Sequence, residues 1–294
     1  MPRHFIAVIA VLVIGLAAAG PAGAVTGGTP TDRGEYPHLA ALLDDGFQYC
    51  DGSLVAPGWV LTAAHCTEDI DVDTLTVEIG GDYLEGSLAW AITDAQNEVR
   101  SVSQMIAHPN WDPDTLSYDV ALLKLGSPST KTPLPLADAS SASDRAQWSG
   151  GKPARVIGYG LPSGPEAGAP LETDVHMVSD ADCETSYALT GPVDTDTMVC
   201  AGEVYGIKDA CFGDSGGPLM VPVTGTDLTT QLMQVGVVSW GTACGVPTQY
   251  GVYARVGDDP LNDWIRSRIG GGPSATGKGR NRPKKPKPQR GHHS

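Results

Sequence analysis

Short stretches in which apolar and polar residues alternate run through most of this chain. Clusters of Gly, Pro, Asp and Ser separate them, an arrangement typical of β-strands that bury one face and are joined by turns. Few stretches have the wider spacing of an amphipathic helix. The pattern predicts an all-β fold, with strands expected over residues 52–61, 75–79, 99–107, 155–158 and 234–240.

One helix stands out near the end of this β-rich body. Over residues 260–269 a proline lies at the start, Trp264 and Ile265 fall on the expected buried face, and Gly270 follows. Proline in the first turn and glycine after the last are helix start and stop signals. We therefore predict a C-terminal α-helix.

The first 24 residues differ from the rest of the chain. They begin with Arg3 and His4, continue as an apolar run over 5–19, and end in Ala-Gly-Ala at 22–24. This order predicts a secretory signal peptide and an extracellular protein. A membrane anchor is the alternative, but the run is shorter than the roughly 20 residues of a spanning helix. No other stretch is long and apolar enough to span a bilayer.

Charge is divided unequally between the remaining two parts. All 34 acidic residues lie in 25–269 with 11 of the 19 Lys and Arg, whereas 270–294 holds seven Lys and Arg and no acid. An acidic body disfavours nucleic acid as a partner, although its simplest interpretation is a solvated surface. The Gly-, Pro- and Lys-rich tail is expected to be disordered. One hypothesis is that the tail contacts an anionic cell surface.

Residues 208–218 have the most distinctive local sequence, Lys-Asp-Ala-Cys-Phe-Gly-Asp-Ser-Gly-Gly-Pro. Gly213, Gly216 and Gly217 permit backbone conformations that other residues avoid, so amide groups could converge near the Ser215 hydroxyl and hold an oxyanion. The alternative is an ordinary disulfide-anchored turn, since Gly-Ser-Gly is common in loops. Partners elsewhere in the chain decide between these interpretations.

Two such partners lie upstream. His65 stands beside Cys66 at the end of an apolar run, and Asp119 begins the strand-like run 119–125. A serine hydroxyl becomes a good nucleophile when an imidazole accepts its proton and an anion orients the imidazolium. Each residue alone is more often structural. Together, in the order His, Asp, Ser, they indicate nucleophilic catalysis.

In these motifs the chain resembles the trypsin-like serine proteases of the chymotrypsin family, from about residue 25 to residue 269, and is similar to a secreted bacterial-type trypsin. The resemblance implies two six-stranded antiparallel β-barrels with a C-terminal α-helix. It implies that Ser215 attacks the scissile carbonyl while His65 removes its proton. Asp119 would then orient the imidazolium, and the amides of Gly213 and Ser215 would hold the oxyanion.

The same resemblance implies a substrate pocket whose floor is Asp209, six residues before the nucleophile. A carboxylate there selects Arg or Lys before the cut bond, and Gly241 and Gly251 leave room for a long side chain. Ala210 offers no hydroxyl to an ammonium, whereas a guanidinium pairs with Asp209 through two hydrogen bonds, so we predict that Arg is preferred.

The resemblance also assigns roles to the segment 239–241. Ser239 is expected behind Asp119, and the backbone through Trp240 is expected to pair with an extended substrate as an added strand. The substrates would be peptides or proteins, bound by a monomer that uses no organic cofactor.

Asp214 is implied to pair with an N-terminal ammonium that forms when the chain is cut before Val25. Thr26 departs from the apolar residue usual at the second position in the family. Signal cleavage directly before Val25 would activate the protein on secretion. Cleavage after Ala19 would instead leave residues 20–24 as a propeptide, and the sequence does not separate these alternatives.

Six cysteines fit an oxidising compartment, but sequence alone does not determine their pairing. The resemblance implies no free thiol and three disulfides: Cys50 with Cys66, Cys183 with Cys200, and Cys211 with Cys244. Zinc is a weak alternative, because the nearest approach to a Cys/His cluster is His65 beside Cys66.

No metal site is predicted elsewhere. Asp82 and Glu85 are the only carboxylates in 80–88, where the family binds calcium, and they are equally well interpreted as solvated acids. Tyr250 stands where some relatives have a tyrosine linked to sodium binding, and an aromatic support for the loop is the favoured interpretation.

The sequence thus predicts a secreted serine endopeptidase that cleaves after Arg and Lys. The alternative from another class is a catalytically silent, protease-like binding module. It is disfavoured because His65, Asp119 and Ser215 all stand within intact motifs. A hydrolase that prefers esters is disfavoured by Asp209.

Overall fold

The computed structural model describes residues 25–82, 97–160, 168–191, 193–223, 225–229 and 231–270. Several predictions lie outside these residues. They are the signal peptide over 1–24 with its anchor and propeptide alternatives, Glu85 of the candidate calcium loop, and the basic tail beyond Gly270.

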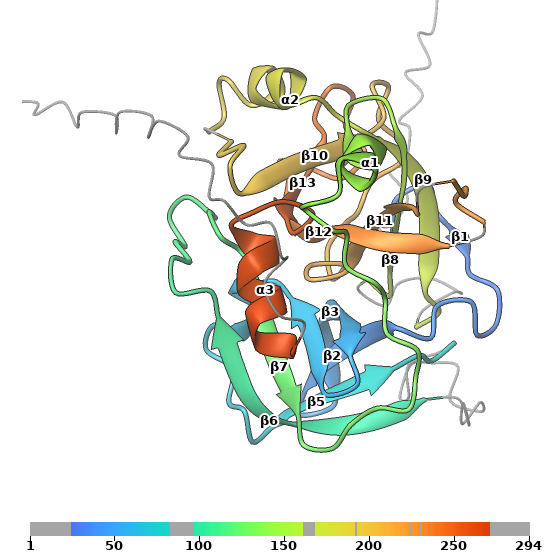
Figure 1. Ribbon diagram of the computed structural model, residues 1–294, viewed down its shortest axis with the longest axis vertical. Coiled ribbons are helices and arrows are strands. Elements are labelled where there is room, and N and C mark those ends of the chain that lie inside the picture. The colour runs from blue at the N-terminus through green and yellow to red at the C-terminus, as the bar shows by residue number, and fades with distance from the viewer. Residues whose placement is uncertain are drawn as a thin grey trace, which may run out of the picture.

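The N-terminal half of the described chain forms a closed antiparallel barrel of six strands (Figure 1), in the order β2, β3, β4, β7, β6, β5. Its strands are β2 Leu39–Asp44, β3 Phe47–Ala56, β4 Trp59–Thr62, β5 Leu75–Ile79, β6 Glu98–Ala107 and β7 Ala121–Leu125.

The C-terminal half forms a second antiparallel barrel, which closes because β8 pairs with both β9 and β11. A two-residue strand, β1 (Thr29–Pro30), adds to the edge of β9. The barrel strands are β8 Pro153–Gly158, β9 Leu171–Met177, β10 Met198–Gly202, β11 Pro218–Pro222, β12 Leu232–Trp240 and β13 Gly251–Arg255. The predicted fold of two six-stranded barrels is confirmed.

The barrels pack against each other through the outer face of β12 and β13. Neighbouring side chains of a strand point to opposite faces. Accordingly, Val238 and Tyr253 join the core of the second barrel, whereas Val237 and Ala254 pack into the apolar cluster of the first. β12 is therefore buried on both faces along most of its length, and residues at its end lie where the two barrels meet.

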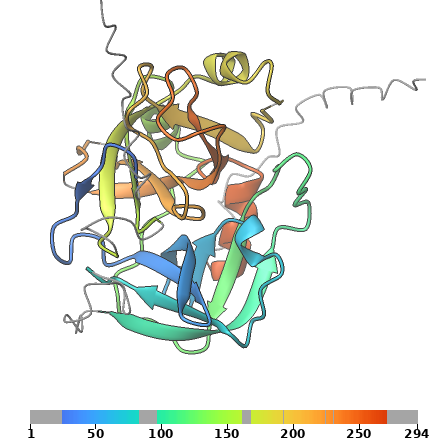
Figure 2. The ribbon, with the colours of Figure 1, turned by 180° about the vertical axis from the view of Figure 1, so that it is seen from behind.

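The C-terminal helix α3 (Leu261–Ile269) follows the last strand of the second barrel but packs on the first, beside β7 in Figures 1 and 2. Leu261, Trp264 and Ile265 enter the core of the first barrel. Burying each such side chain contributes about 1.5–3 kcal/mol. The helix ends at Gly270, which has a φ of 88°, so the predicted helix, buried face and stop signal are confirmed.

Most predicted strands are observed, several with one or two extra residues. The range 75–79 is β5, and the ranges 99–107, 155–158 and 234–240 lie within β6, β8 and β12. The single strand expected over 52–61 is wrong. Pro57 and Gly58 form a turn there, and Ala56 pairs back with Trp59. Proline has no N–H for a ladder and glycine suits a turn, so the apolar run is a hairpin.

Two short α-helices among the described residues were not predicted. They are α1 (Ala142–Arg145) and α2 (Asp180–Ser186), each preceded by a serine whose hydroxyl accepts an amide N–H at 3.2 Å. The cue was a serine three residues before an aspartate, at Ser141 and Ser179. Such a cap stabilises a helix too short to show an apolar periodicity.

Candidate active site

His65 and Asp119 are brought together by adjacent strands of the first barrel. β4 pairs with β7 so that Thr62 lies opposite Ala121, and both residues lie just beyond this pair. His65 Nδ1 lies 2.7 Å from Asp119 Oδ2, and the His65 amide donates to Oδ1 at 2.9 Å. Two contacts from one residue hold the imidazole in a single orientation toward the carboxylate.

The carboxylate of Asp119 is buried and also contacts the second barrel. The Ser239 hydroxyl, near the end of β12, donates to Asp119 Oδ2 at 2.5 Å. Asp119 is 1 % exposed. The predicted position of Ser239 behind Asp119 is therefore what the structure contains, and the pair links the two barrels at this point.

Burial and charge act in opposite directions on His65. Burial lowers the pKa of His65, but the hydrogen bond to Asp119 and the charges of Asp119 and Glu68 outweigh burial, so the net pKa is raised above 6.5. The buried carboxylate thus favours the imidazolium. This is the property required of a group that accepts a proton during a reaction.

The loop that carries Ser215 depends on its glycines, though not all in the same way. Gly213 and Gly216 have φ values of 90° and 86°, which side chains disfavour. A Cβ on Gly216 would also lie 2.2 Å from the carbonyl oxygen of Asp51. Gly217 does not have a positive φ, contrary to expectation. Glycine is needed at this position because a Cβ would lie 2.9 Å from the main-chain carbonyl oxygen of Asp214.

The Ser215 backbone lies against the residues that flank His65. Its carbonyl oxygen accepts the Asp51 amide at 2.7 Å and lies 3.7 Å from Cys66 Sγ. Cys66 follows His65 and is bonded to Cys50 of β3. The serine loop of the second barrel is therefore docked on the histidine segment of the first.

A cavity of about 200 Å³ opens beside Ser215 and has Asp209 among its lining residues. Asp209 Oδ2 accepts the Gly245 amide at 3.1 Å, whereas Oδ1 is buried with no hydrogen-bond partner among the described residues. Burial raises the pKa of Asp209 to about 6, partly offset by the amides of Gly245 and Ala210. An unpaired buried carboxylate oxygen is costly unless a ligand supplies a donor.

The remaining residues expected in this pocket also line it. The lining includes Ala210, Ser239, Trp240, Gly241 and Gly251. A Cβ on Gly251 would lie 2.7 Å from Asp209 Oδ1, whereas one on Gly241 would meet no atom closer than 4.0 Å. Gly251 therefore keeps the carboxylate accessible, and Gly241 leaves open space.

Sequence reasoning missed Tyr253 and Phe212 as lining residues. Tyr253 is buried, and its hydroxyl lies 3.1 Å from where a Cβ on Gly251 would be. Two residues apart on one strand point to the same side, so the expected role of Gly251 in the pocket already indicated Tyr253. Phe212 is 68 % exposed and has no comparable signal.

Val25 and Asp214 also lie together, as expected. Val25 is 1 % exposed, and its nitrogen lies 2.9 Å from Asp214 Oδ2, which also accepts the Cys211 amide at 2.7 Å. Thr26 pairs with Asp209 through its backbone, its carbonyl accepting the Asp209 amide at 3.2 Å. The unusual residue at this second position is therefore used for its main chain.

All six cysteines are bonded in the implied pairs: Cys50 with Cys66, Cys183 with Cys200, and Cys211 with Cys244. Among the described residues, one group of possible metal ligands comes within 4.8 Å of one another, namely Cys50, Cys66 and His65. Its two sulfurs are bonded to each other, so neither is a free thiolate that could bind a metal ion. Tyr250 packs in the cluster around Tyr187 and accepts the Tyr187 hydroxyl on its carbonyl.

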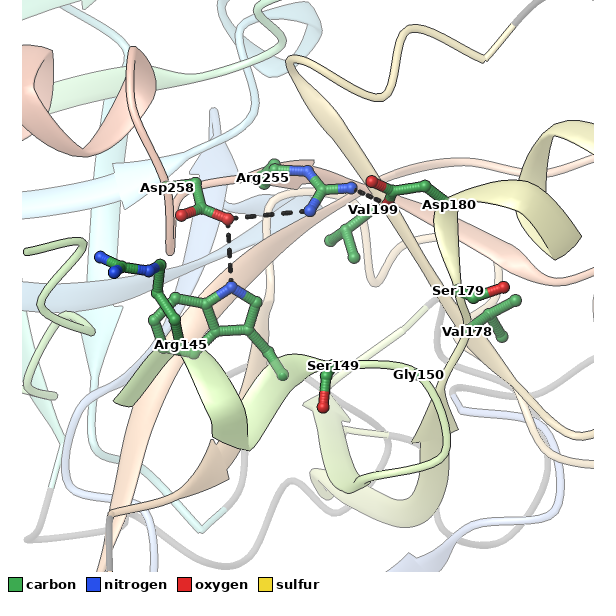
Figure 3. Close-up of a pocket in the computed structure, with 10 residues that line it drawn as sticks. Arg145, Ser149, Gly150, Val178, Ser179, Asp180, Val199, Arg255 and Asp258 are labelled. Carbon is green, nitrogen blue, oxygen red and sulfur yellow. Dashed lines mark hydrogen bonds and ion pairs between the residues drawn. The ribbon is translucent and has the colours of Figure 1, made fainter. Parts of the chain in front are cut away.

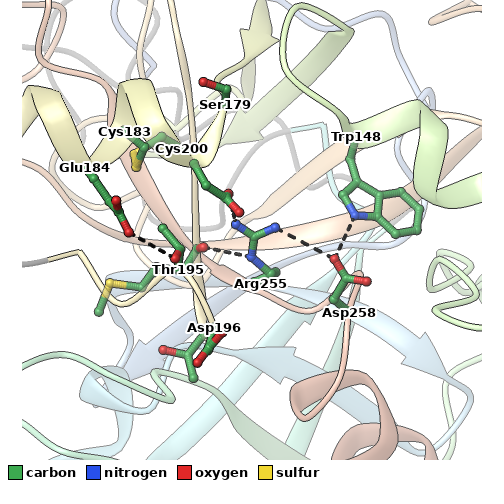
Figure 4. A network of polar contacts seen from close by, with 12 residues as sticks. Trp148, Ser179, Cys183, Glu184, Thr195, Asp196, Cys200, Arg255 and Asp258 are labelled. Carbon is green, nitrogen blue, oxygen red and sulfur yellow. Dashed lines mark hydrogen bonds and ion pairs between the residues drawn. A yellow bond between two sulfur atoms is a disulfide. The ribbon is translucent and has the colours of Figure 1, made fainter. Parts of the chain in front are cut away.

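A larger cavity, of about 290 Å³, shares no lining residue with the first. Figure 3 shows Arg255 at its side, between Asp180 and Asp258. Trp148 Nε1 donates to the same Asp258 at 3.2 Å (Figure 4). Arg255 Nε also donates to the Met198 carbonyl at 2.8 Å. The arginine is already compensated by two carboxylates, so we assign this cavity a structural role.

Within the part of the chain that the structure describes, no helix is both long enough and apolar enough to cross a bilayer.

Comparison with known proteins identifies the family. The family model described as Trypsin matches residues 25–265. A trypsin of Saccharopolyspora erythraea is 34 % identical over 236 residues, covering 79 % of this chain and 93 % of its own. The chain belongs to the trypsin family of serine proteases, which are hydrolases.

Two mouse relatives are longer than this chain. Serine protease 56 of Mus musculus is 34 % identical over 86 % of this chain and 40 % of its own length. Vitamin K-dependent protein C of Mus musculus is 33 % identical over 84 % of this chain and 52 % of its own length. The chain therefore spans about half or less of these two relatives.

Proposed function

We propose that this protein is a serine endopeptidase that cleaves peptide bonds after Arg and, less readily, after Lys. The observation that carries the proposal is the unpartnered Oδ1 of Asp209, buried in a cavity that also contains Ser215. A substrate guanidinium that enters this cavity would donate hydrogen bonds to that oxygen. The carbonyl of the same substrate residue would then lie beside Ser215.

The proposed catalytic steps give one role to each of three side chains. Ser215 Oγ attacks the scissile carbonyl and its proton passes to His65 Nε2. The His65 Nδ1–H donates to Asp119 at 2.7 Å, so the imidazolium is stabilised as it forms. The proton then moves to the departing amine, an acyl-enzyme remains on Ser215, and water releases it by the same steps.

The oxyanion of each tetrahedral intermediate is held by the amides of Gly213 and Ser215. The φ of 90° at Gly213 is the kind of backbone conformation that lets nearby amides point into one space. Donors that are already oriented toward the developing charge need no reorganisation during the reaction.

Cleavage before Val25 would complete the site. Val25 has a φ of 26°, which is unfavourable for a β-branched residue because of the preceding carbonyl. A cut before Val25 removes that carbonyl and turns the amide into an ammonium beside Asp214. The resulting buried ion pair would hold the loop that carries Gly213 and Ser215.

An exported, extracellular protein suits these features. The three disulfides are stable in an oxidising compartment. The role as a catalytically silent binding module has no observation in its favour, since the contacts among His65, Asp119 and Ser239 are intact. A monomer, and contact of the basic tail with an anionic surface, complete the proposal.

Peptide substrates that differ only in the residue before the cut bond test the proposal. We expect kcat/KM to be about tenfold or more higher for Arg than for Lys, because one additional charge-assisted hydrogen bond contributes about 1.5 kcal/mol. A Phe peptide should react far more slowly than either. The enzyme preparation is first shown by N-terminal sequencing to begin at Val25.

Three results would contradict this expectation. A preference for Lys would overturn the assigned role of Ala210, and rapid cleavage of the Phe peptide would overturn that of Asp209. Failure to cleave any peptide, together with failure to react with a serine-directed phosphonylating reagent, would favour the silent binding module.

The pH dependence of phosphonylation tests the assignment of His65. The reaction requires neutral imidazole, and the pKa of His65 is raised above 6.5 by Asp119 and Glu68 against the effect of burial. The rate should therefore fall as pH decreases through a pKa above 6.5. A reagent without a basic side chain avoids the separate titration of Asp209. Asp119→Asn should shift the midpoint to lower pH, and an unchanged midpoint would exclude this coupling.

A further inference from the structure

Asp51 is a buried carboxylate that the proposed mechanism does not use. It follows Cys50 in β3 and is 0 % exposed. Its amide donates to the Ser215 carbonyl at 2.7 Å, and its carbonyl accepts the Thr62 hydroxyl at 2.7 Å. The main chain of Asp51 thus joins the nucleophile loop to the strand that leads to His65.

The side chain of Asp51 reaches the same loop by a second route. Its Oδ1 accepts Gln48 Nε2 at 3.2 Å, and that nitrogen also donates to the Gly213 carbonyl at 3.1 Å. Its Oδ2 accepts the Tyr159 amide at 2.8 Å. Neither of these side-chain contacts provides a positive charge.

Asp51 and Asp214 face each other across Gly158. A Cβ placed on this glycine would lie 2.2 Å from Asp214 Oδ1 and 2.7 Å from Asp51 Oδ2. Asp214 is also 0 % exposed, and its Oδ1 has no hydrogen-bond partner among the described residues. The space between the carboxyl groups is therefore closed to side chains, and one acceptor in it lacks a donor.

Two adjacent buried carboxylates do not both ionise readily, so the pair retains a proton. Asp214 is the member that would gain a charge partner, because its Oδ2 lies 2.9 Å from the Val25 nitrogen, which becomes an ammonium on the proposed cleavage. We propose that Asp51 keeps this proton and uses it to donate a hydrogen bond to Asp214 Oδ1. Asp51 is then a positioning residue for the pair formed by Asp214 and Val25. The role, and the assignment of the proton to Asp51, rest on the proposed function, whereas the presence of one shared proton does not.

A protonated carboxyl group fits this position better than an amide. The Oδ2 of Asp51 both accepts the Tyr159 amide and faces Asp214 Oδ1. A hydroxyl oxygen donates and accepts at once, whereas each end of an amide does only one of these. This explains why the residue is Asp and not Asn.

Burial favours a proton on the pair, since it also raises the pKa of Asp214 to about 7. Burial, and then the charge of Asp214, raise the pKa of Asp51 well above its usual range. Both nearby phenols are neutral, because burial raises their pKa values well above 10.0. The other titratable groups that act on the pair are Asp209, Tyr159 and Tyr253, and the Val25 nitrogen joins them once the chain is cut before it.

The test measures how the stability of two proteins depends on pH, one with Asp51 and one with Asp51→Asn. Both also contain Ser215→Ala, so that neither activity nor self-digestion interferes. Asp51 binds its proton more tightly in the folded state, so stability is lost as pH rises from the usual carboxyl pKa of about 4 toward the raised value. Asn does not titrate. The unfolding equilibrium constant of the Asp51 protein, relative to Asp51→Asn, should therefore rise by up to about tenfold per pH unit.

The control is Asp45→Asn, at an exposed residue in the turn between β2 and β3; it should give no such slope. Parallel pH profiles for Asp51 and Asp51→Asn would overturn the proposal. If Asp51→Asn does not fold, infrared difference spectra of the Asp51 protein and Asp51→Gly at neutral pH replace it. A protonated-carboxyl band present only with Asp51 supports the proposal, and its absence overturns it.

The active enzyme provides a separate readout of positioning. Ionisation of Asp51 at alkaline pH places a second negative charge beside Asp214, so activity of the Asp51 enzyme on an Arg peptide should decline at lower pH than that of Asp51→Asn. If the activities of the two enzymes decline at the same alkaline pH, Asp51 has no positioning role, even if it carries the proton. If only the expected pH dependence of unfolding is absent, the protease assignment is unaffected. If the protein does not cleave peptides, the unfolding test of the shared proton is still valid.

Discussion

Replacing Ser215 with Ala should lower kcat on an Arg peptide by about a millionfold, as expected when the nucleophile of a cooperating triad is lost. The remaining contacts between His65, Asp119 and Ser239 would have no hydroxyl to activate. A small residual rate above that in water should persist, because the cavity still binds substrate and the loop amides still polarise its carbonyl.

The fold should survive this change. The contacts of Ser215 with Asp51 and Cys66 are made by its carbonyl, which alanine keeps. Ser143→Ala, at an exposed position of α1, is the matched control and should have full activity. Peptide hydrolysis and mass spectrometry after phosphonylation measure the effect. Undiminished labelling of Ser215→Ala would place the nucleophile at another residue.

Asp209→Asn should reduce kcat/KM on an Arg peptide by about a hundredfold to ten-thousandfold. Removing one partner of a buried charge pair costs about 3–5 kcal/mol, because the other charge remains desolvated. Asn keeps the shape of the side chain and the acceptor for the Gly245 amide. The loss is therefore attributable to charge and not to a cavity.

The comparison substrate is the Phe peptide, whose cleavage should be unchanged or improved when the carboxylate is removed.

For wild type, kcat/KM on the Arg peptide should also fall as pH decreases through about 6, the raised pKa of Asp209, in addition to the effect of His65. The kcat/KM of Asp209→Asn should not show this additional decrease at acid pH. An equal loss on Arg and Phe peptides would show that Asp209 supports the fold and not specificity.

The fold was predictable where local patterns and motifs are strong. The alternation over 75–79 and the stop at Gly270 correspond to β5 and to the end of α3. The hairpin at Pro57 was missed because both its strands are apolar, so the run looked continuous. The short helices α1 and α2 were missed because four and seven residues are too few for a periodicity.

The candidate site was predictable for a different reason. His65, Asp119 and Ser215 stand in short motifs whose residue types have few other uses together, and Asp209 keeps a set spacing to the serine. Asp51 and Gln48 carry no such signal. Their significance depends on the loop of the second barrel that packs against them, and no pattern near residue 50 refers to that loop.

By itself, the sequence determined the β-rich class and the C-terminal helix, and it predicted the catalytic residue types and an acidic pocket floor, because each depends on local spacing or on a recognisable motif. Only the tertiary structure decided which groups meet. Asp119 lies 54 residues from His65 and 120 from Ser239, and barrel closure brings them together. It also decided that Asp51 and Asp214 share one buried space. Burial is a property of the packed chain, and it raises the pKa of an aspartate that in the unfolded chain would be ordinary.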